Sequence, residues 1–217
     1  LQNDEHIGSK FDFILTNPPF NQKEWGLNDL LNDKRWIYGI PPTNNANMAW
    51  VQHVLSKLKQ KGRAGIFLAN GSLTSGGDEL AIKKKIFNEG LVECMISIPG
   101  KMFSNTPIPV TIWLFNLNPS SRNKKNKEVL TIDLEGSETR SSKRKNFLNS
   151  ETINMISAKI IDFRNENLKK ESQTDLYRIV GVQDIADRNF KVNPSRYLKR
   201  KKIKKLNLDL KNFGNLL

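Results

Sequence analysis

The apolar run Phe11 to Thr16 ends at two consecutive prolines, and this junction limits what the chain can fold into. A short apolar run with such a boundary is typical of a buried β-strand. Proline has no backbone N–H to donate to a sheet, so a central strand cannot continue through it. The sequence therefore predicts a buried strand that ends in a rigid loop at Asn17-Pro18-Pro19-Phe20.

Strands and helices alternate along the next hundred residues. The apolar patterns predict strands at 64–69, 91–98 and 109–116, helices at 47–59 and 78–88, and an edge strand at 128–134. Such alternation is typical of an α/β protein with a parallel sheet and right-handed crossovers. The strands at 91–98 and 109–116 are joined by a segment too short for a helical crossover, so the second of them is expected to run antiparallel.

The positive charge is concentrated in the second half of the chain. Residues 1–118 contain 12 Lys and Arg against 10 Asp and Glu, whereas residues 119–217 contain 23 against 12. A strongly basic segment indicates a polyanionic partner, most often nucleic acid. A solvated lysine-rich surface is the alternative, because Lys outnumbers Arg 25 to 10. We divide the chain into an α/β domain over residues 1–135 and a basic, mainly helical extension over residues 136–217.

Composition argues against several classes of protein. No apolar run approaches the length of a membrane span, and the N-terminal segment shows no signal-peptide pattern. A single cysteine, Cys94, excludes an internal disulfide framework and a multi-cysteine zinc site. Because the histidines are only His6 and His53, no metal centre is expected. The sequence predicts a cytoplasmic protein without a metal.

The loop after the first strand carries the groups best suited to chemistry. In an open α/β sheet, ligands bind at the carboxyl ends of the strands. The Asn17 carboxamide and the Pro18 carbonyl offer two hydrogen-bond acceptors on a backbone that Pro19 stiffens further. Phe20 offers a flat face on which an aromatic ring can stack. Two acceptors beside a stacking surface fit a planar heterocycle with an amino group, such as adenine, although Asn and Pro are also ordinary turn residues.

The wider sequence resembles a known enzyme family. F-D-x-I-L-x-N-P-P-F over residues 11–20 resembles the catalytic motif of S-adenosylmethionine-dependent amino-methyltransferases. Four further blocks resemble the modification (M) subunit of type I restriction–modification systems: W-x-Y-G-x-P-P-x-x-N-A-N-x-A-W at 36–50, G-R-A-G-x-x-L-A-N-G-S-L at 62–73, I-P-G-K-M-F-x-x-T-x-I-P at 98–109 and N-P-S-R-Y at 193–197. That subunit is an adenine-N6 DNA methyltransferase, and the resemblance is dense from residue 11 to about residue 118.

The resemblance implies a function and a set of partners. It implies transfer of a methyl group from S-adenosylmethionine to an adenine flipped out of DNA, with Asn17 and Pro18 accepting hydrogen bonds from the adenine amine. Phe20 would stack on the base, and Phe103 is a second candidate for the base pocket. The implied partners are DNA and the specificity and restriction subunits of a type I system. No metal takes part in this chemistry.

One departure concerns the cofactor. In this family a glycine-rich loop and an acidic residue that precede the catalytic motif hold S-adenosylmethionine, and no F-x-G-x-G-like segment occurs in these 217 residues. The chain therefore resembles the C-terminal half of the methyltransferase sheet, with the main cofactor-binding loop absent. We expect this chain alone to bind S-adenosylmethionine weakly or not at all, and to be inactive by itself.

Two other functions are compatible with the same residues. Asn-Pro-Pro loops also serve methylation of RNA bases and of glutamine side chains. Alternatively, the chain is a non-catalytic basic module that binds DNA or a partner subunit. Among individual residues, Ser72 and Thr74 precede a predicted helix and are weak candidates for a phosphate site. Asp12, His53 and Cys94 are expected to be structural.

Loss of the first half of a methyltransferase sheet would leave the strand Phe11 to Thr16 at an edge. Beyond Asp12 near its start, both of its faces are apolar, so the rest of the strand has no charge or proline to block pairing with another strand. We expect a homodimer across this edge or a C-terminal helix, predicted at 198–212, folded over it, with the dimer favoured.

The densest basic cluster is expected to contact DNA phosphates or partner subunits, and it consists of Lys199, Arg200, Lys201, Lys202, Lys204 and Lys205. Each phosphate contact releases counterions, so binding to DNA should weaken as salt rises. Neutralising four of the lysines should flatten the slope of log affinity against log salt by a few units, measured by fluorescence anisotropy with duplex DNA. An unchanged slope would make the cluster a solvated surface.

Overall fold

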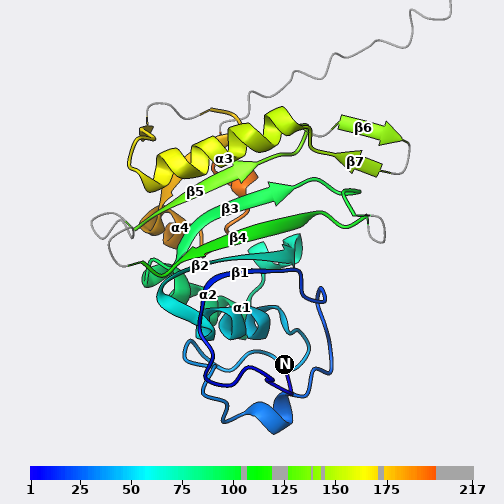
Figure 1. Cartoon of the computed structure of the whole chain (residues 1–217), viewed down its shortest axis with the longest axis vertical. Coiled ribbons are helices and arrows are strands. Elements are labelled where there is room, and N and C mark those ends of the chain that lie inside the picture. The colour runs from blue at the N-terminus through cyan, green and yellow to red at the C-terminus, as the bar shows by residue number, and fades with distance from the viewer. Residues whose placement is uncertain (104–106, 119–126, 138, 143–144, 171–173, 199–217) are drawn as a thin grey trace, which may run out of the picture.

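The computed structural model describes residues 1–103, 107–118, 127–137, 139–142, 145–170 and 174–198. Its centre is a six-stranded mixed sheet in the order β1-β2-β4-β3-β5-β8 (Figure 1). The strands are β1 (Phe11–Thr16), β2 (Leu58–Ala69), β3 (Val92–Ile98), β4 (Val110–Asn116), β5 (Glu128–Asp133) and β8 (Tyr177–Gly181). A separate hairpin consists of β6 (Thr139–Ser142) and β7 (Lys145–Phe147). The expected mixed α/β class is confirmed.

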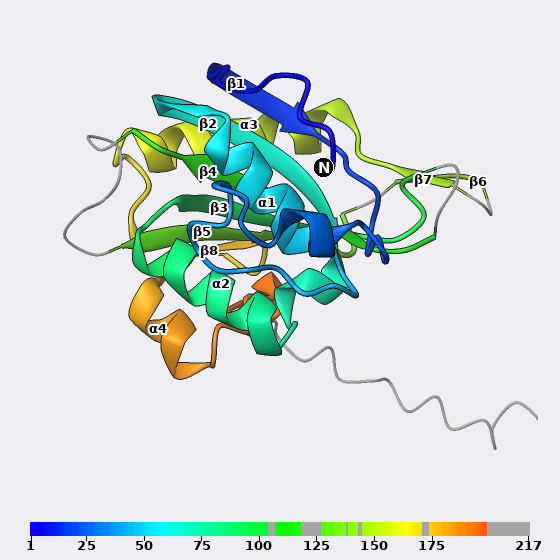
Figure 2. The same ribbon diagram turned by 90° about the horizontal axis from the view of Figure 1, so that it is seen from below.

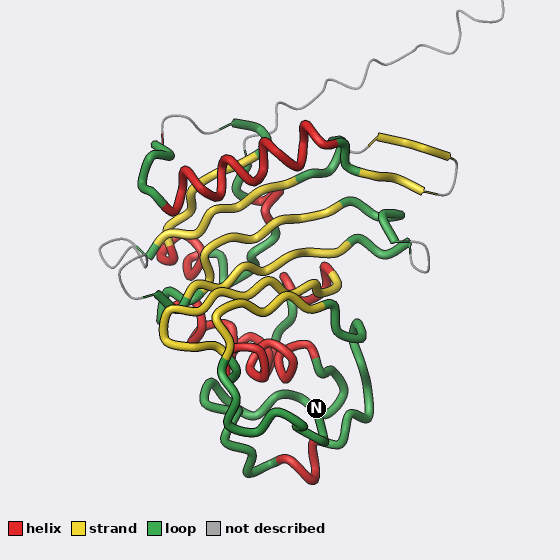
Figure 3. The backbone as a smooth tube through the Cα atoms, viewed as in Figure 1, coloured by secondary structure: helices red, strands yellow, loops and turns green. Residues whose placement is uncertain are grey.

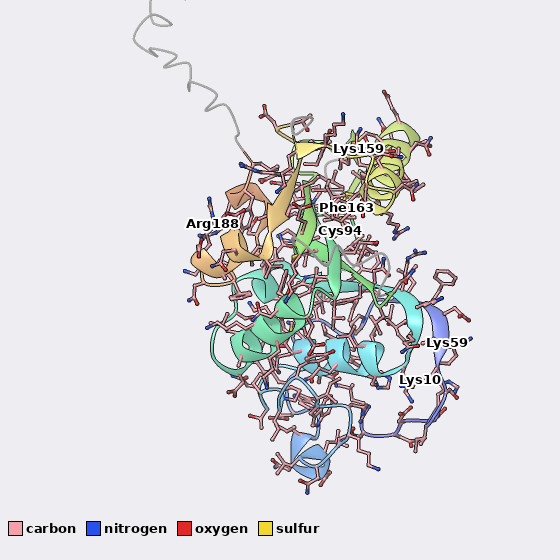
Figure 4. All side chains as sticks on the ribbon, turned by 90° about the vertical axis from the view of Figure 1, so that its left-hand side faces the viewer. Lys10, Lys59, Cys94, Lys159, Phe163 and Arg188 are labelled. Atoms are coloured by element: carbon pink, nitrogen blue, oxygen red, sulfur yellow. The ribbon has the colours of Figure 1, made fainter. Side chains whose placement is uncertain are left out.

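Helices cover both faces of the sheet (Figure 2). The α-helices are α1 (Asn47–Ser56), α2 (Gly77–Asn88), α3 (Ser150–Arg164) and α4 (Val182–Asp187). The described residues also form the 3-10 helices η1 (Leu27–Leu30), η2 (Asn70–Leu73) and η4 (Pro194–Arg196). Apolar side chains of α1, α2 and α4 pack on one face around the fully buried Trp113 and Phe87. On the other face α3 packs with Phe163 in the same cluster as Cys94 of β3 (Figure 4).

Strand directions decide where the connecting loops lie. β1 and β2 are parallel, β3 and β5 are parallel, and β4 is antiparallel to both β2 and β3. The carboxyl ends of β1, β2, β3 and β5 therefore share one edge of the sheet, which we call the carboxyl edge. The antiparallel direction expected for 109–116 is confirmed in β4.

Two strand predictions are wrong. Residues 58 and 59, predicted as helix, already belong to β2, because the backbone there pairs with β1 at Phe11. The strand at 128–134 was expected at an edge, but β5 lies between β3 and β8. β8 is an additional antiparallel partner, and its Tyr177 and Ile179 side chains are buried against the sheet.

The predicted helical extension over 136–217 is not confirmed. Its described part contains α3 and α4 but also the strands β6, β7 and β8. β8 pairs with β5 and so belongs to the main sheet. The domain division at residue 135 stays a prediction. The basic cluster at 199–205 and most of the helix predicted at 198–212 lie outside the described residues.

The long segment from residue 21 to residue 45 is ordered mainly by aromatic packing. Trp25 and Trp36 are buried, and their rings meet edge to face with centroids 5.8 Å apart. Tyr38 is also buried and donates a hydrogen bond from its hydroxyl to the Glu89 carboxylate at 3.1 Å. The segment packs against α1 as a small core of its own, which includes Ala46 and Ala49.

β1 is an edge strand in the described chain. No described strand pairs with its outer side, and Phe13 and Leu15 are 74% and 78% exposed. Asp12 forms an exposed salt bridge to Lys59 at 2.7 Å, a structural role at the start of the strand (Figure 4). Coverage of this edge by a second copy or by a C-terminal helix stays a prediction.

An ion pair between half-buried Arg164 and buried Glu93 attaches α3 to the sheet. Arg164 donates two hydrogen bonds, at 2.9 and 2.7 Å, to the Glu93 carboxylate of β3, which is 7% exposed and also accepts one from Asn116. The hydrogen bonds to Glu93 raise the pKa of Arg164 above its ordinary value. Arg164 therefore stays protonated throughout the physiological range.

Arg164→Met should destabilise the fold by about 3 kcal/mol, because it leaves the Glu93 carboxylate buried without its counter-charge. Urea denaturation at pH 7 measures this change. Lys159→Met on the same helix is the control, since its salt bridge to Asp162 is half-exposed and 3.9 Å long and should contribute about 1 kcal/mol or less. Equal losses in the two variants would contradict the assignment.

Candidate active site

The predicted catalytic loop lies at the carboxyl edge. β1 pairs with β2 up to Thr16 opposite Ile66, and the chain leaves the sheet at Asn17. The loop between β3 and β4 returns to the same edge, where the Asn70 N–H donates to the Pro109 carbonyl at 3.2 Å. Loops from three strands therefore meet beside Asn17.

The tetrapeptide presents one polar and one apolar group. Asn17 and Pro19 are exposed, Pro18 is buried and Phe20 is half-buried. Within the described residues the Asn17 carboxamide has no hydrogen-bond partner, so it is available to a ligand. The exposure of Asn17 leaves its carboxamide accessible, and the acceptor and stacking roles expected from the sequence stay predictions.

Phe20 and Phe103 belong to one apolar cluster on the α3 face of the sheet. The cluster also contains Met102 and Phe67, and the rings of Phe67 and Phe103 meet edge to face with centroids 6.0 Å apart. Phe103 is itself half-buried. Both aromatic residues that the sequence nominated for the base pocket therefore pack on the α3 face of the sheet, and their role in such a pocket stays a prediction.

A tight turn holds Met102 and Phe103 in this place. A Cβ atom on Gly100 would lie 2.5 Å from the Pro107 carbonyl oxygen, so no other residue fits there without a backbone shift. The next residue, Lys101, has a φ of 64° and donates its N–H to the same carbonyl at 3.3 Å. The turn therefore depends on close contact between two backbone segments.

A buried lysine forms hydrogen bonds to the backbone of the loop after β2. Lys83 of α2 is fully buried and donates to the carbonyls of Ser72 and Ser75 at 3.1 and 2.9 Å. Burial lowers the pKa of Lys83 to about 8. Ser72 is 1% exposed, which leaves its hydroxyl out of reach of a phosphate, and α2 begins at Gly77 without a side-chain cap. Thr74 is exposed, and a phosphate contact at this residue stays a prediction.

A second polar cluster holds the N-terminal segment and the 21–45 segment together. Arg35 is 8% exposed, donates to both Asp33 oxygens at 2.9 and 2.6 Å and to the Leu1 carbonyl at 2.9 Å, and contacts His53 Nδ1 at 2.9 Å. Burial, assisted by the nearby Arg35 charge, lowers the pKa of His53 to about 4. His53 is therefore neutral and structural at neutral pH.

The described residues show no alternative chemistry. Burial raises the pKa of the Cys94 thiol, so this side chain behaves as a small apolar group. No three His, Cys, Asp or Glu side chains in the described ranges gather where they could hold a metal ion. In the same ranges, no helix combines the length and the apolar character needed to cross a bilayer.

Comparison with known proteins agrees with this geometry. Residues 1–206 match the family model described as N-6 DNA methylase. The chain belongs to this family.

Individual relatives of this N-6 DNA methylase chain come from type I restriction enzymes. The HindI methylase subunit of Haemophilus influenzae is 50% identical over 131 residues, which are 59% of this chain and 28% of that protein. The MjaIX methylase subunit of Methanocaldococcus jannaschii is 31% identical over 202 residues, 90% of this chain and 36% of that protein. The chain thus spans about a third of the length of these relatives.

A solved structure shares the fold. The methyltransferase subunit of a type I restriction–modification system from Streptococcus thermophilus has a TM-score of 0.77 and 25% identity, covering 91% of this chain and 40% of that one. The resemblance to type I methylase subunits found in the sequence motifs is confirmed, and the sheet is that of the methyltransferase subunits.

Sequence reasoning missed the residues that hold the site in place. Gly100, Lys83 and Asn47 contact loop backbone rather than a substrate surface, and Asn47 hydrogen-bonds to Asn21, directly after the tetrapeptide. The closely spaced asparagines of the N-A-N block were visible in the sequence. Their use became apparent only when the structure placed them beside residue 21.

Acid should destabilise the fold through His53. An unperturbed histidine titrates near 6.5, whereas His53 in the fold titrates at about 4. Between these values the unfolded chain binds a proton that the folded chain does not, so stability is fully present above pH 6.5 and is lost as the pH falls toward 4. The urea midpoint of the wild type should therefore drop more between pH 7 and pH 4.5 than that of His53→Gln.

Asp33 should not interfere with this experiment. Hydrogen bonds from Arg35 hold the pKa of Asp33 below its ordinary value, so Asp33 loses its contribution only at lower pH. A parallel decline of the two proteins across the window would show that another group is responsible.

Proposed function

We propose that the chain carries the catalytic loop and the target-base side of an adenine-N6 DNA methyltransferase, as part of a type I methylase subunit. The observation that supports this most is the exposed Asn17 carboxamide at the carboxyl edge, which has no hydrogen-bond partner among the described residues, with Phe20 and Phe103 on the α3 face of the same sheet. Family membership supports the same reaction.

Asn17 and Pro18 would activate the adenine amine. The lone pair of N6 is delocalised into the ring and is a weak nucleophile. Hydrogen bonds donated by N6 to Asn17 Oδ1 and to the Pro18 carbonyl favour a tetrahedral nitrogen whose lone pair is available. A bond then forms between N6 and the methyl carbon, the sulfur–methyl bond breaks, and N6 loses one proton to solvent.

S-adenosylmethionine would supply the methyl group as a sulfonium. The described residues fit the acceptor side of this reaction, with a free carboxamide and an apolar cluster, but the sequence has no F-x-G-x-G-like segment. We propose that the residues holding the cofactor lie outside these 217, consistent with the shorter span of the chain relative to its relatives.

The target base must leave the duplex to reach this loop. A flipped adenine presents its faces to apolar or aromatic side chains and its amino edge to polar groups. Phe20 and Phe103 would supply the first and Asn17 the second. The half-buried state of both phenylalanines leaves part of each side chain accessible for such a contact.

DNA would approach along the carboxyl edge. The β6–β7 hairpin extends from the sheet at this edge (Figures 1 and 3). We propose that this hairpin and the Lys199 to Lys205 cluster contribute backbone contacts, and that the specificity and restriction subunits are further partners in the cytoplasm. One structural neighbour comes from a study of type I complex assembly.

Methylation of RNA or of glutamine side chains is the second candidate. The Asn-Pro-Pro loop would serve this reaction equally, but the HindI and MjaIX relatives are methylase subunits of type I restriction enzymes. A purely DNA-binding role without catalysis is the third, and it does not account for an exposed, unpartnered carboxamide beside the aromatic cluster.

Asn17→Ala in the complete methylase should lower the rate of methyl transfer at least about 100-fold, because it removes a contact that strengthens in the transition state. Binding of S-adenosylmethionine, measured by calorimetry, should be nearly unchanged. The transfer assay uses tritiated cofactor with unmodified chromosomal DNA, and parallel reactions with RNA and protein test the second candidate.

Asn28→Ala is the matched control, because Asn28 is exposed and lies in the 3-10 helix η1, outside the Asn17–Phe20 tetrapeptide. It should retain the wild-type rate. If Asn17→Ala retained more than about a tenth of the wild-type rate, the catalytic assignment would be wrong.

A further inference from the structure

The chain turns sharply as it leaves the tetrapeptide. Asn21, the residue after Phe20, has a φ of 51°, in the left-handed region that asparagine tolerates better than most residues. Its side chain is exposed, so packing does not fix this turn. The backbone conformation at Asn21 must therefore be fixed by hydrogen bonds.

One buried carboxamide holds Asn21 by two hydrogen bonds. Asn47 Oδ1 accepts from the Asn21 backbone N–H at 3.2 Å, and Asn47 Nδ2 donates to Asn21 Oδ1 at 2.9 Å. Asn47 is 1% exposed although it is polar. Donor and acceptor of the same amide therefore both engage the residue that follows the catalytic loop.

Neighbouring bonds reinforce this contact. The Ala46 N–H donates to the Gln22 carbonyl at 2.9 Å, and Asn45 Nδ2 lies 3.4 Å from Asn21 Oδ1. Asn45 Oδ1 in turn accepts from the Asn47 backbone N–H at 2.9 Å. Two short segments, 21–22 and 45–47, are thus tied together across the base of the long segment between them.

Asn47 is mounted on a rigid support. It is the first residue of α1, and the adjacent Met48 and the following Val51 are fully buried against the sheet. A helix packed in this way presents a side chain more reproducibly than a loop does. Movement of Asn47 would require movement of α1 itself.

We propose that Asn47 is a positioning residue for methyl transfer, which fixes the exit of the catalytic loop while the pairing of β1 with β2 fixes its entry. This inference rests on the proposed function. With both ends held, Asn17 and Pro18 keep their two acceptors aimed at one amine. Such aim matters because a misplacement of about 1 Å can lower a rate roughly 100-fold.

Substitutions that change single atoms test this role in the complete methylase. Asn47→Asp keeps the acceptor for the Asn21 N–H but replaces the donor with an oxygen that faces Asn21 Oδ1. It should lower kcat by about 10- to 100-fold while KM for S-adenosylmethionine changes less than about twofold. Tritium transfer to unmodified chromosomal DNA measures both constants.

A second pair of variants keeps the test valid if Asn47→Asp folds poorly. Asn21→Gly retains the N–H and tolerates the positive φ but loses the side-chain acceptor, and at an exposed position it should fold normally. The kcat of Asn21→Gly should fall several-fold. Asn21→Asp keeps the acceptor and should retain more of kcat than Asn21→Gly, an order that a nonspecific effect on the loop would not produce.

Asn44→Ala is the control, since Asn44 is exposed in the same loop. The inference is overturned if the wild type is active and both Asn47→Asp and Asn21→Gly match its kcat, or if their losses appear in KM and melting temperature alone. A wild-type enzyme that transfers no methyl group to DNA would instead overturn the proposed function and the inference with it.

Discussion

Backbone hydrogen bonds between β1 and β2 place the predicted catalytic tetrapeptide at the edge of the sheet where the loops after β2 and β3 also lie. The pairing is parallel and ends at Thr16, so the two prolines begin where the ladder stops. Because β4 runs antiparallel to its neighbours, the loop that contains Phe103 returns to the same edge. Strand direction therefore places Asn17 and the loop that contains Phe103 at one edge of the sheet, although they lie more than eighty residues apart in the sequence.

The irregular parts of this edge are held by buried polar side chains. Arg35 holds the N-terminal segment, Asn47 holds the exit of the tetrapeptide, and Lys83 holds the loop after β2. Each satisfies backbone groups that have no partner in a helix or sheet, which would otherwise be costly to bury. Their positions on packed helices or beside buried tryptophans allow loops without regular structure to keep a defined shape.

Much of the fold follows from the spacing of apolar residues, while some strands depend on their neighbours. Runs such as Phe11 to Thr16 are apolar enough to read as strands in any α/β context, and β1 was predicted to the residue. β8 escaped prediction because Arg178 and Gly181 interrupt a run of only five residues. That segment becomes a strand through pairing with β5, a contact to residues about fifty positions earlier in the chain.

The sequence by itself determined the features on which the proposed chemistry rests: a strand that must stop at two prolines, an asparagine and a phenylalanine at the stop, and family motifs around them. These are local properties of residue type and order. The tertiary structure decided that Phe20 and Phe103 pack on the same face of the sheet, that Ser72 is buried, and that Asn47 hydrogen-bonds to Asn21. The physical reason is that burial and hydrogen-bond geometry depend on which distant segments meet, and a hydrogen bond between residues 21 and 47 has no signature until the chain is folded.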